Sequence, residues 1–178
     1  MQQPISSAGF REALSQFASG VTIVAVRQAA GLSGFTATGF SSVSLAPPLI
    51  LVCVNKIASA HGAFVAAECF GVSVLAEQQA WIATQFARSG VDRFAGIPMA
   101  REGLSGVPLI RDALAHIVCR RHAVHDAGDH TIVIGEVLEA CVTPGRPLVH
   151  FSRQFGAFHQ GVSACSSALA SAVPHGPP

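Results

Sequence analysis

Residues 131–142 constrain the fold more than any other segment, because they are apolar on both faces of an extended strand. Successive side chains of a strand point to opposite faces of the sheet. One face would carry Ile132, Ile134 and Leu138, and the other Val133, Val137 and Cys141. A sheet with one face in water would not need this pattern. We therefore expect a barrel strand with one face in the core and the other in a dimer interface.

Several other apolar runs, separated by glycine, proline or polar residues, predict further strands. Two successive prolines, Pro47 and Pro48, cannot both donate to a sheet, so the strand before them must end there. A turn at Ala127-Gly128-Asp129 between two apolar runs predicts a hairpin. The predicted strands cover residues 21–26, 35–41, 49–54, 70–75, 113–125, 130–141 and 147–151. Many short strands with few helices predict a mainly β fold, a closed antiparallel barrel with flanking helices.

Three segments have a helical pattern. Phe10, Leu14 and Phe17 have helical spacing, which predicts an amphipathic helix over residues 10–18. The other two helices are predicted over residues 59–67, with Ser59 as N-cap, and over residues 77–88. The last segment, residues 161–178, is rich in Ser, Ala, Gly and Pro. We expect one domain over residues 1–160, followed by a flexible tail.

The composition is apolar for a globular chain. Half of the 178 residues are hydrophobic and 12% are charged, and the mean hydropathy is +0.47. No apolar run is long enough for a membrane span, so an obligate subunit interface is the expected use of this surface. The net charge of +1 and the scattered basic residues argue against a nucleic-acid partner. We expect a homodimer without nucleic acid or membrane as partner.

The cysteine pattern argues against a disulfide framework. Five cysteines are present, an odd number without CxxC spacing: Cys53, Cys69, Cys119, Cys141 and Cys165. The N-terminus carries no signal-peptide pattern, so reduced thiols and a cytoplasmic location are expected. Each cysteine lies among apolar residues with no local positive charge, which disfavours a cysteine nucleophile.

The segment 34–49, with sequence GFTATGFSSVSLAPPL, combines serine and threonine hydroxyls with two glycines and a double proline. Small hydroxyl side chains and glycine leave backbone N–H groups accessible, and such a strand-to-turn segment can hold an anion. The alternative is a strand whose hydroxyls only satisfy nearby backbone groups.

From residue 10 to about residue 158, the order of motifs resembles the flavin reductase-like, FMN-binding split-barrel family. The matching pieces are FREALSQFASGVTIV, GFTATGFSSVSLAPPLILVCVNK, TQFA, DRFAG, AGDHTIVIGEV and PLVHFSRQFG. The resemblance implies a homodimeric split β-barrel of antiparallel Greek-key type with a few flanking helices.

The resemblance also implies flavin contacts along four segments. The implied residues are Gly34, Phe35, Thr36, Ala37, Thr38, Gly39, Ser42 and Ser44; Cys53, Val54, Asn55 and Lys56; Ser59 and Ala60; and Gln85 and Phe86. A helix N-terminus near Ser59 is expected to receive the flavin phosphate, and a phosphate salt bridge is open to Lys56. The alternatives are a solvated turn lysine for Lys56 and a core position for Phe86.

His130 follows Asp129 in the predicted hairpin, where the family's histidine lies beside the nicotinamide of NAD(P)H. Imidazole can stack on or hydrogen-bond to the nicotinamide without transferring a proton to the hydride. The alternative is a turn histidine in solvent. His150, Phe151, Ser152 and Arg153 match the family's late nicotinamide-side segment. Relatives usually carry an aromatic residue followed by Arg-Gly there.

The chain has eight histidines, which makes a metal site an alternative to consider. His122, His125 and His130 are the closest cluster, but His122 and His125 would point to opposite faces of a regular strand. No HExxH motif is present. We expect no metal site.

The sequence therefore predicts an NAD(P)H-dependent flavin reductase using FMN, with FAD also open. A hydride would pass from nicotinamide to flavin, and reduced flavin would leave for a partner monooxygenase. The rival is a non-catalytic split-barrel protein that binds FMN as a carrier or sensor.

Overall fold

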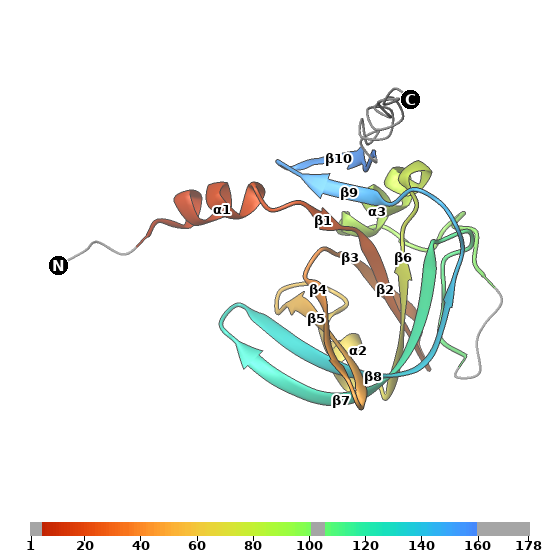
Figure 1. Ribbon diagram of the computed structural model, residues 1–178. Helices are drawn as coiled ribbons and strands as arrows, with labels where there is room; N and C mark the ends of the chain where they lie inside the picture. The colour runs from red at the N-terminus through yellow and green to blue at the C-terminus, as the bar shows by residue number, and fades with distance from the viewer. Residues whose placement is uncertain (1–4, 101–105, 160–178) are drawn as a thin grey trace, which may run out of the picture.

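The computed structural model describes residues 5–100 and 106–159 (Figure 1). The predicted tail, residues 161–178, lies outside the described residues. Two antiparallel sheets hold nearly half of the described residues and the helices hold far fewer, which confirms the mainly β fold. Seven strands form the larger sheet in the order β3-β2-β6-β7-β8-β5-β4, and three form the smaller sheet in the order β1-β9-β10.

The larger sheet contains every long strand of the described chain. Its members are β2 (Thr22–Gln28), β3 (Gly31–Ala37), β4 (Phe40–Leu45), β5 (Pro48–Asn55), β6 (Cys69–Val74), β7 (Ala115–Ala127) and β8 (His130–Val142). The smaller sheet contains β1 (Ser19–Gly20), β9 (Leu148–Phe151) and β10 (Gln154–Ala157). The sequence patterns did not predict β1 or β10, which are too short to show a period.

The larger sheet curves into a barrel but does not close, so the expectation of a closed barrel was wrong. β3 and β4 lie at opposite ends of the strand order and are not paired with each other. Residues 38 and 39 run from one edge to the other, so the single strand predicted over residues 35–41 is two strands. An added Cβ at Gly39 would lie 3.0 Å from Cys53 Cβ. This close approach explains a glycine at the corner.

The predicted hairpin at residues 127–129 and the predicted strand end before Pro47 are both confirmed. β4 ends at Leu45 and β5 begins at Pro48, with a cis peptide bond between Ala46 and Pro47. Proline is tolerated as the first residue of a strand, because no ladder bond precedes it. Ala127 pairs with His130 in the β7–β8 hairpin, and the positive φ of Gly128, 68°, fits a type II′ turn.

A short helix, α2 (His61–Ala66), contributes the central side chain of the barrel core. Phe64 is 1% exposed, and its ring lies 5.2 Å from that of Phe35 and 5.0 Å from that of Phe70, both edge to face. Gly135 makes room for this cluster, because an added Cβ would lie 2.5 Å from Phe70 Cζ. The core therefore depends on aromatic packing around one helix.

A second cluster packs between β2 and the segment η1–α3, which consists of a 3₁₀ turn (Glu77–Gln79) and a helix (Ala80–Ala87). Phe86 is 1% exposed and packs against Phe94. At Gly34 of β3, an added Cβ would lie 2.9 Å from Phe86 Cε1. Glycine at this position lets α3 approach the sheet closely.

The first helix, α1 (Ser7–Ser15), begins and ends earlier than the prediction of residues 10–18. Ser6 caps it by accepting a bond from the Gly9 amide at 3.1 Å. None of its residues is buried. In Figure 1, α1 projects from the barrel on the same side as the tip of the β7–β8 hairpin.

The outer face of β8 is only partly covered. Within the described chain, Ile132 and Ile134 are half-buried and Leu138 is 43% exposed, whereas Val133 on the inner face is fully buried.

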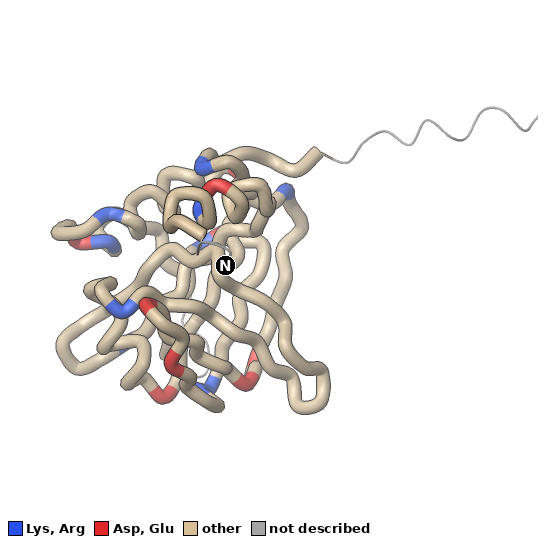
Figure 2. The backbone as a smooth tube through the Cα atoms, turned by 90° about the vertical axis from the view of Figure 1, so that its left-hand side faces the viewer, with Lys and Arg blue, Asp and Glu red and all other residues tan. Residues whose placement is uncertain are grey.

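Charged residues are distributed over several elements (Figure 2). In residues 5–100 and 106–159, no helix is both long and apolar enough to cross a membrane. The four cysteines within the described residues are free thiols: Cys53, Cys69, Cys119 and Cys141. Burial raises the pKa of Cys119 to about 12.

Candidate functional site

A groove of about 810 Å³ lies at the split in the barrel. It runs between α1, the corner at residues 38 and 39, the start of β8 and the turn after β9. Its lining residues are Ser7, Phe10, Arg11, Leu14, Ser15, Phe17, Ser19, Thr38, Gly39, Phe40, Ser41, Leu51, Asp129, His130, His150 and Arg153. Five of these were candidates from the sequence: Thr38, Gly39, His130, His150 and Arg153. The groove therefore joins candidates that are far apart in sequence.

The corner at residues 38 and 39 lies in the groove because it bridges the two sheet edges. The Cys53 amide donates to Gly39 O at 2.8 Å, which fixes the corner against β5. Phe40 and Ser41 follow it into the groove lining. Sequence reasoning missed these two residues, although both stand in the hydroxyl-rich segment, because it treated the segment as one strand.

Two other hydroxyls of that segment have backbone partners. Thr36 Oγ1 donates to Ala83 O at 2.7 Å and so ties β3 to α3. Ser44 Oγ accepts from the Ala46 amide at 3.2 Å within the β4–β5 turn. Ser42 is exposed and, like Ser44, is not among the groove residues. The alternative of local backbone satisfaction therefore describes Ser44, whereas the Thr36 hydroxyl bonds a backbone group that is distant in sequence.

His130 begins β8 and lines the groove beside Asp129. Its Nδ1 lies 2.7 Å from Asp129 Oδ1, and its side chain is 41% exposed. The hydrogen bond and charge of His130 lower the pKa of Asp129, with a smaller effect from Lys56. An ionised carboxylate can only accept, so Nδ1 carries a proton in this contact. The pair holds the imidazole in one orientation at the groove wall.

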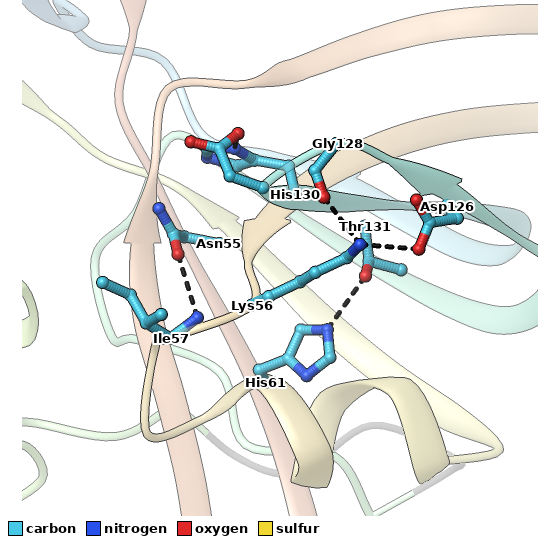
Figure 3. A network of polar contacts seen from close by, with 9 residues as sticks. Asn55, Lys56, Ile57, His61, Asp126, Gly128, His130 and Thr131 are labelled. Atoms are coloured by element: carbon cyan, nitrogen blue, oxygen red, sulfur yellow. Dashed lines mark hydrogen bonds and ion pairs between the residues drawn. The ribbon is translucent and has the colours of Figure 1, made fainter.

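Lys56 is neither a free turn lysine nor a free cation. Its Nζ donates to Asp126 Oδ2 and to Gly128 O, both at 2.6 Å (Figure 3). The hydrogen bond and charge of Lys56 lower the pKa of Asp126. Lys56 is absent from the lining of the groove. Asn55 Oδ1 accepts from the Ile57 amide at 2.9 Å and shapes the same turn.

A second cavity of about 260 Å³ contains two more of the candidates, Gly34 and Ser59. Ser59 is not the N-cap of α2: the cap is Ala60, without a side-chain bond, and the helix begins at His61. The helix is one residue too far along for the predicted cap, and it has only six residues. The N-cap prediction for Ser59 was therefore wrong, whereas a phosphate near this helix N-terminus stays a prediction.

Arg93 lines the second cavity and was missed as a site residue. Its Nε donates to Arg88 O at 2.9 Å, and one terminal nitrogen donates to Gly34 O at 3.0 Å. Gln85 supports this loop, donating to Arg93 O at 3.0 Å and Ala95 O at 2.9 Å. The DRFAG motif was the sequence signal that pointed to this loop.

Five candidates are core or wall residues. Phe35, Ala37, Val54, Ala60 and Phe86 are all buried. The core alternative for Phe86 is therefore confirmed. Cys53 is half-buried on β5, and burial raises the pKa of its thiol.

The turn after β9 joins α1 to the groove. Ser152 and Arg153 have positive φ angles of 48° and 63°, the pattern of a type I′ hairpin turn between β9 and β10. The Ser152 amide donates to Ser15 O at 2.9 Å, and Arg153 pairs with Glu12 at 3.3 Å. Phe151 is 47% exposed and lies outside the groove lining. The His150 ring packs against Phe155 at 5.7 Å.

Across the described residues, no group of three His, Cys, Asp or Glu side chains is close enough to hold a metal ion. The parity argument for His122 and His125 assumed a regular strand. A bulge between Arg121 and Ala123 breaks that regularity, so the parity argument does not hold.

Comparison with known proteins identifies the family. The model of the flavin reductase like domain matches residues 14–159. The chain belongs to the flavin reductase-like family. It is 42% identical over 153 residues to the FMN reductase (NADH) SmoA of Agrobacterium fabrum, covering 86% of this chain and 87% of the relative.

Two solved flavin reductases are similar in fold. The NADH:FAD oxidoreductase SgcE6 of Streptomyces globisporus, in complex with NAD and FAD fragments, has a TM-score of 0.82 and 36% identity, covering 93% of this chain and 99% of that one. BorF, the flavin reductase component of a bacterial two-component tryptophan halogenase, has a TM-score of 0.81 and 40% identity, covering 88% and 100%. The split-barrel resemblance inferred from the motifs is thereby confirmed.

The groove fits the flavin that the family name implies. Its volume lies within the range of roughly 300–1,000 Å³ typical of small-molecule sites. Phe10, Leu14 and Phe40 offer apolar surface to a ring, and the Thr38 and Ser41 hydroxyls offer hydrogen bonds to a polar tail. The residues present are therefore of the types that a flavin needs.

Proposed function

We propose that this flavin reductase-like protein is an NAD(P)H-dependent flavin reductase that reduces FMN or FAD. The single observation that carries the proposal is the groove at the barrel split, with His130 in its wall, in a chain of this family. Relatives named as reductases for FMN, FAD and a 4-nitrophenol monooxygenase system support it. Reduced flavin would leave the groove and supply a partner monooxygenase.

The bound flavin would supply the chemistry, accepting a hydride from the nicotinamide. The protein then has to bind, orient and shield the two rings, without a general base. Thr38, Gly39 and Ser41 are proposed to contact the flavin. His130 is proposed to contact the nicotinamide, held there by Asp129. His150 and Arg153, which also line the groove, are proposed to contact the nicotinamide side.

The remaining sequence candidates stay predictions. Gly34 and Ser59 line the second cavity, where the Arg93 guanidinium could serve the polar end of a flavin. Ser42, Cys53, Asn55, Gln85, Phe151 and Ser152 line neither the groove nor the second cavity, and their flavin or nicotinamide contacts stay predictions. A cytoplasmic location, expected from the cysteine pattern, also stays a prediction.

A homodimer is proposed from the outer face of β5 and β8. Leu51 pairs with Ile134 and Cys53 with Ile132 across these strands, and all four side chains are half-buried in the single chain. Burying such a face removes apolar surface from water. Because Leu51 also lines the groove, a second copy on this face would border the site.

The test is to mix protein, FMN and NADH and to follow the absorbance of NADH. The proposal expects flavin-dependent loss of NADH well above the rate without protein. Reactions with NADPH in place of NADH, and with FAD in place of FMN, measure which nicotinamide and which flavin the protein prefers. If flavin binds but neither nicotinamide is consumed, the protein is a carrier or sensor and the enzyme proposal is wrong.

A further inference from the structure

Lys56 holds the β7–β8 turn at three points. Its Nζ donates to the Asp126 carboxylate and to Gly128 O, both at 2.6 Å, and its backbone amide donates to Asp129 O at 3.0 Å. In Figure 3 the Lys56 side chain runs toward Asp126 and Gly128. One residue of the turn after β5 therefore binds both sides of the turn that precedes His130.

These contacts leave little reason for Lys56 to bind a phosphate. Its ammonium already faces a carboxylate, and a charged hydrogen bond of 2.6 Å is short for this pair. Lys56 lines neither the groove nor the second cavity. A phosphate at this lysine would have to displace Asp126 or share the cation with it.

The same contacts connect Lys56 to the groove wall. Asn55 pairs with His130 across β5 and β8, so the residue before Lys56 lies directly opposite the histidine. Asp129, whose backbone carbonyl Lys56 holds, supplies the carboxylate that binds His130 Nδ1. The position of the turn therefore sets both the backbone and the side-chain partner of His130.

We propose that Lys56, together with Asp126, is a positioning residue that acts through the Gly128–Asp129 turn to hold His130 in the groove wall. It is not a ligand of the flavin phosphate. The consequence for catalysis rests on the proposed function, because it assumes that His130 contacts the nicotinamide. The bracing of the turn by Lys56 and Asp126 does not depend on the proposed function.

The kinetic test compares Lys56→Met and Asp126→Asn with Arg120→Met. Arg120 is the matched control, since it pairs with Glu136 at 2.8 Å between the same two strands but at a distance from the turn. We expect both test variants to raise KM for NADH about threefold to tenfold, the effect of losing a charged surface hydrogen bond. The ratio of KM for FMN to KM for riboflavin should stay unchanged, and Arg120→Met should change neither.

A phosphate role predicts a different pattern. Lys56→Met would then weaken the binding of FMN but not the binding of riboflavin, which has no phosphate. Asp126→Asn would strengthen FMN binding, because it removes the competing carboxylate. Either result overturns the proposal. Asp126 is 78% exposed, so its substitution is a safe second variant if Lys56→Met folds poorly.

Hydrogen–deuterium exchange tests the brace without any activity. In protein without flavin, the peptide containing residues 126–131 should exchange faster in Lys56→Met and Asp126→Asn than in the unaltered protein and in Arg120→Met. Unchanged exchange in both test variants overturns the proposal. If the protein proved inactive as a reductase, faster exchange would still support the brace, so the two failures are distinguishable.

Discussion

Asp129 Oδ1 lies 2.7 Å from Nδ1 of His130, in a contact between neighbouring residues at the tip of the β7–β8 hairpin. The contact assigns the proton to Nδ1 and leaves Nε2 as the ring nitrogen available to another partner. Since His130 lines the groove, this arrangement presents an oriented imidazole to whatever binds there.

His130→Ala should raise KM for NADH more than KM for FMN, because the proposed contact is with the nicotinamide. Asp129→Ala should act in the same direction with a smaller effect, since the ring remains but loses its partner. Steady-state kinetics with each substrate varied in turn measures both. His125→Ala, on the same hairpin but outside the groove, is the control. Equal effects on the two substrates would remove the role proposed for His130.

Gly135→Ala should destabilise the fold by about 1–3 kcal/mol, the usual cost of overpacking a core. The added Cβ would lie 2.5 Å from Phe70 Cζ and 2.9 Å from Cys119 Cβ. Gly156→Ala in β10 is the matched control, because no atom lies within 4 Å of an added Cβ there. Urea unfolding of the two variants gives the comparison, and equal stabilities would contradict the packing described for the core.

The carboxylates of the β7–β8 hairpin should make stability depend on acid pH. The pKa values of Asp126 and Asp129 are lowered from the ordinary value of 3.8 by Lys56 and His130 respectively. A lowered pKa in the folded state means stabilisation above the unfolded value, which is lost as the pH falls below 3.8 through the folded value. When the pH is lowered through this range, the melting temperature of Asp126→Asn should fall less than that of the unaltered protein. An identical fall in both proteins would exclude the contribution.

Ile134→Glu should produce a monomer if the outer face of β8 is the interface. A carboxylate on this half-buried apolar face would be desolvated in a dimer but not in a monomer. Size-exclusion chromatography with light scattering gives the mass of each form. Leu14→Glu on α1 is the control for a general effect of added charge. A dimer that survives the Ile134 change would place the interface elsewhere.

The strand pattern could be predicted from the sequence because strands with buried faces have a strong signal. The predicted bounds of β7 and β8 lie within two residues of those in the structure, and the double proline correctly predicted the end of β4. The corner at residues 38 and 39 could not be predicted, because Phe40 continues the apolar pattern through it. Barrel closure likewise depends on which edges meet, which is a property of the whole sheet.

The candidate site divides in the same way. His130, Thr38 and Gly39 were candidates through the family resemblance of the hairpin and of the hydroxyl-rich segment, and all three line the groove. The contributions of Phe10 and Leu14 could not be predicted, because they depend on where α1 lies relative to the barrel, and that of Ser41 was missed because the corner at residues 38 and 39 was not predicted. The pairing of Lys56 with Asp126 spans 70 residues, and no local pattern indicates it.

The central claim is that this protein passes a hydride from a reduced nicotinamide to a flavin held in the groove. The most direct test is anaerobic mixing of the protein with excess NADH and free FMN, following the flavin absorbance. The account predicts complete bleaching of the flavin, one FMN reduced per NADH oxidised, at a rate proportional to protein concentration. Flavin that stays oxidised with both NADH and NADPH would contradict it.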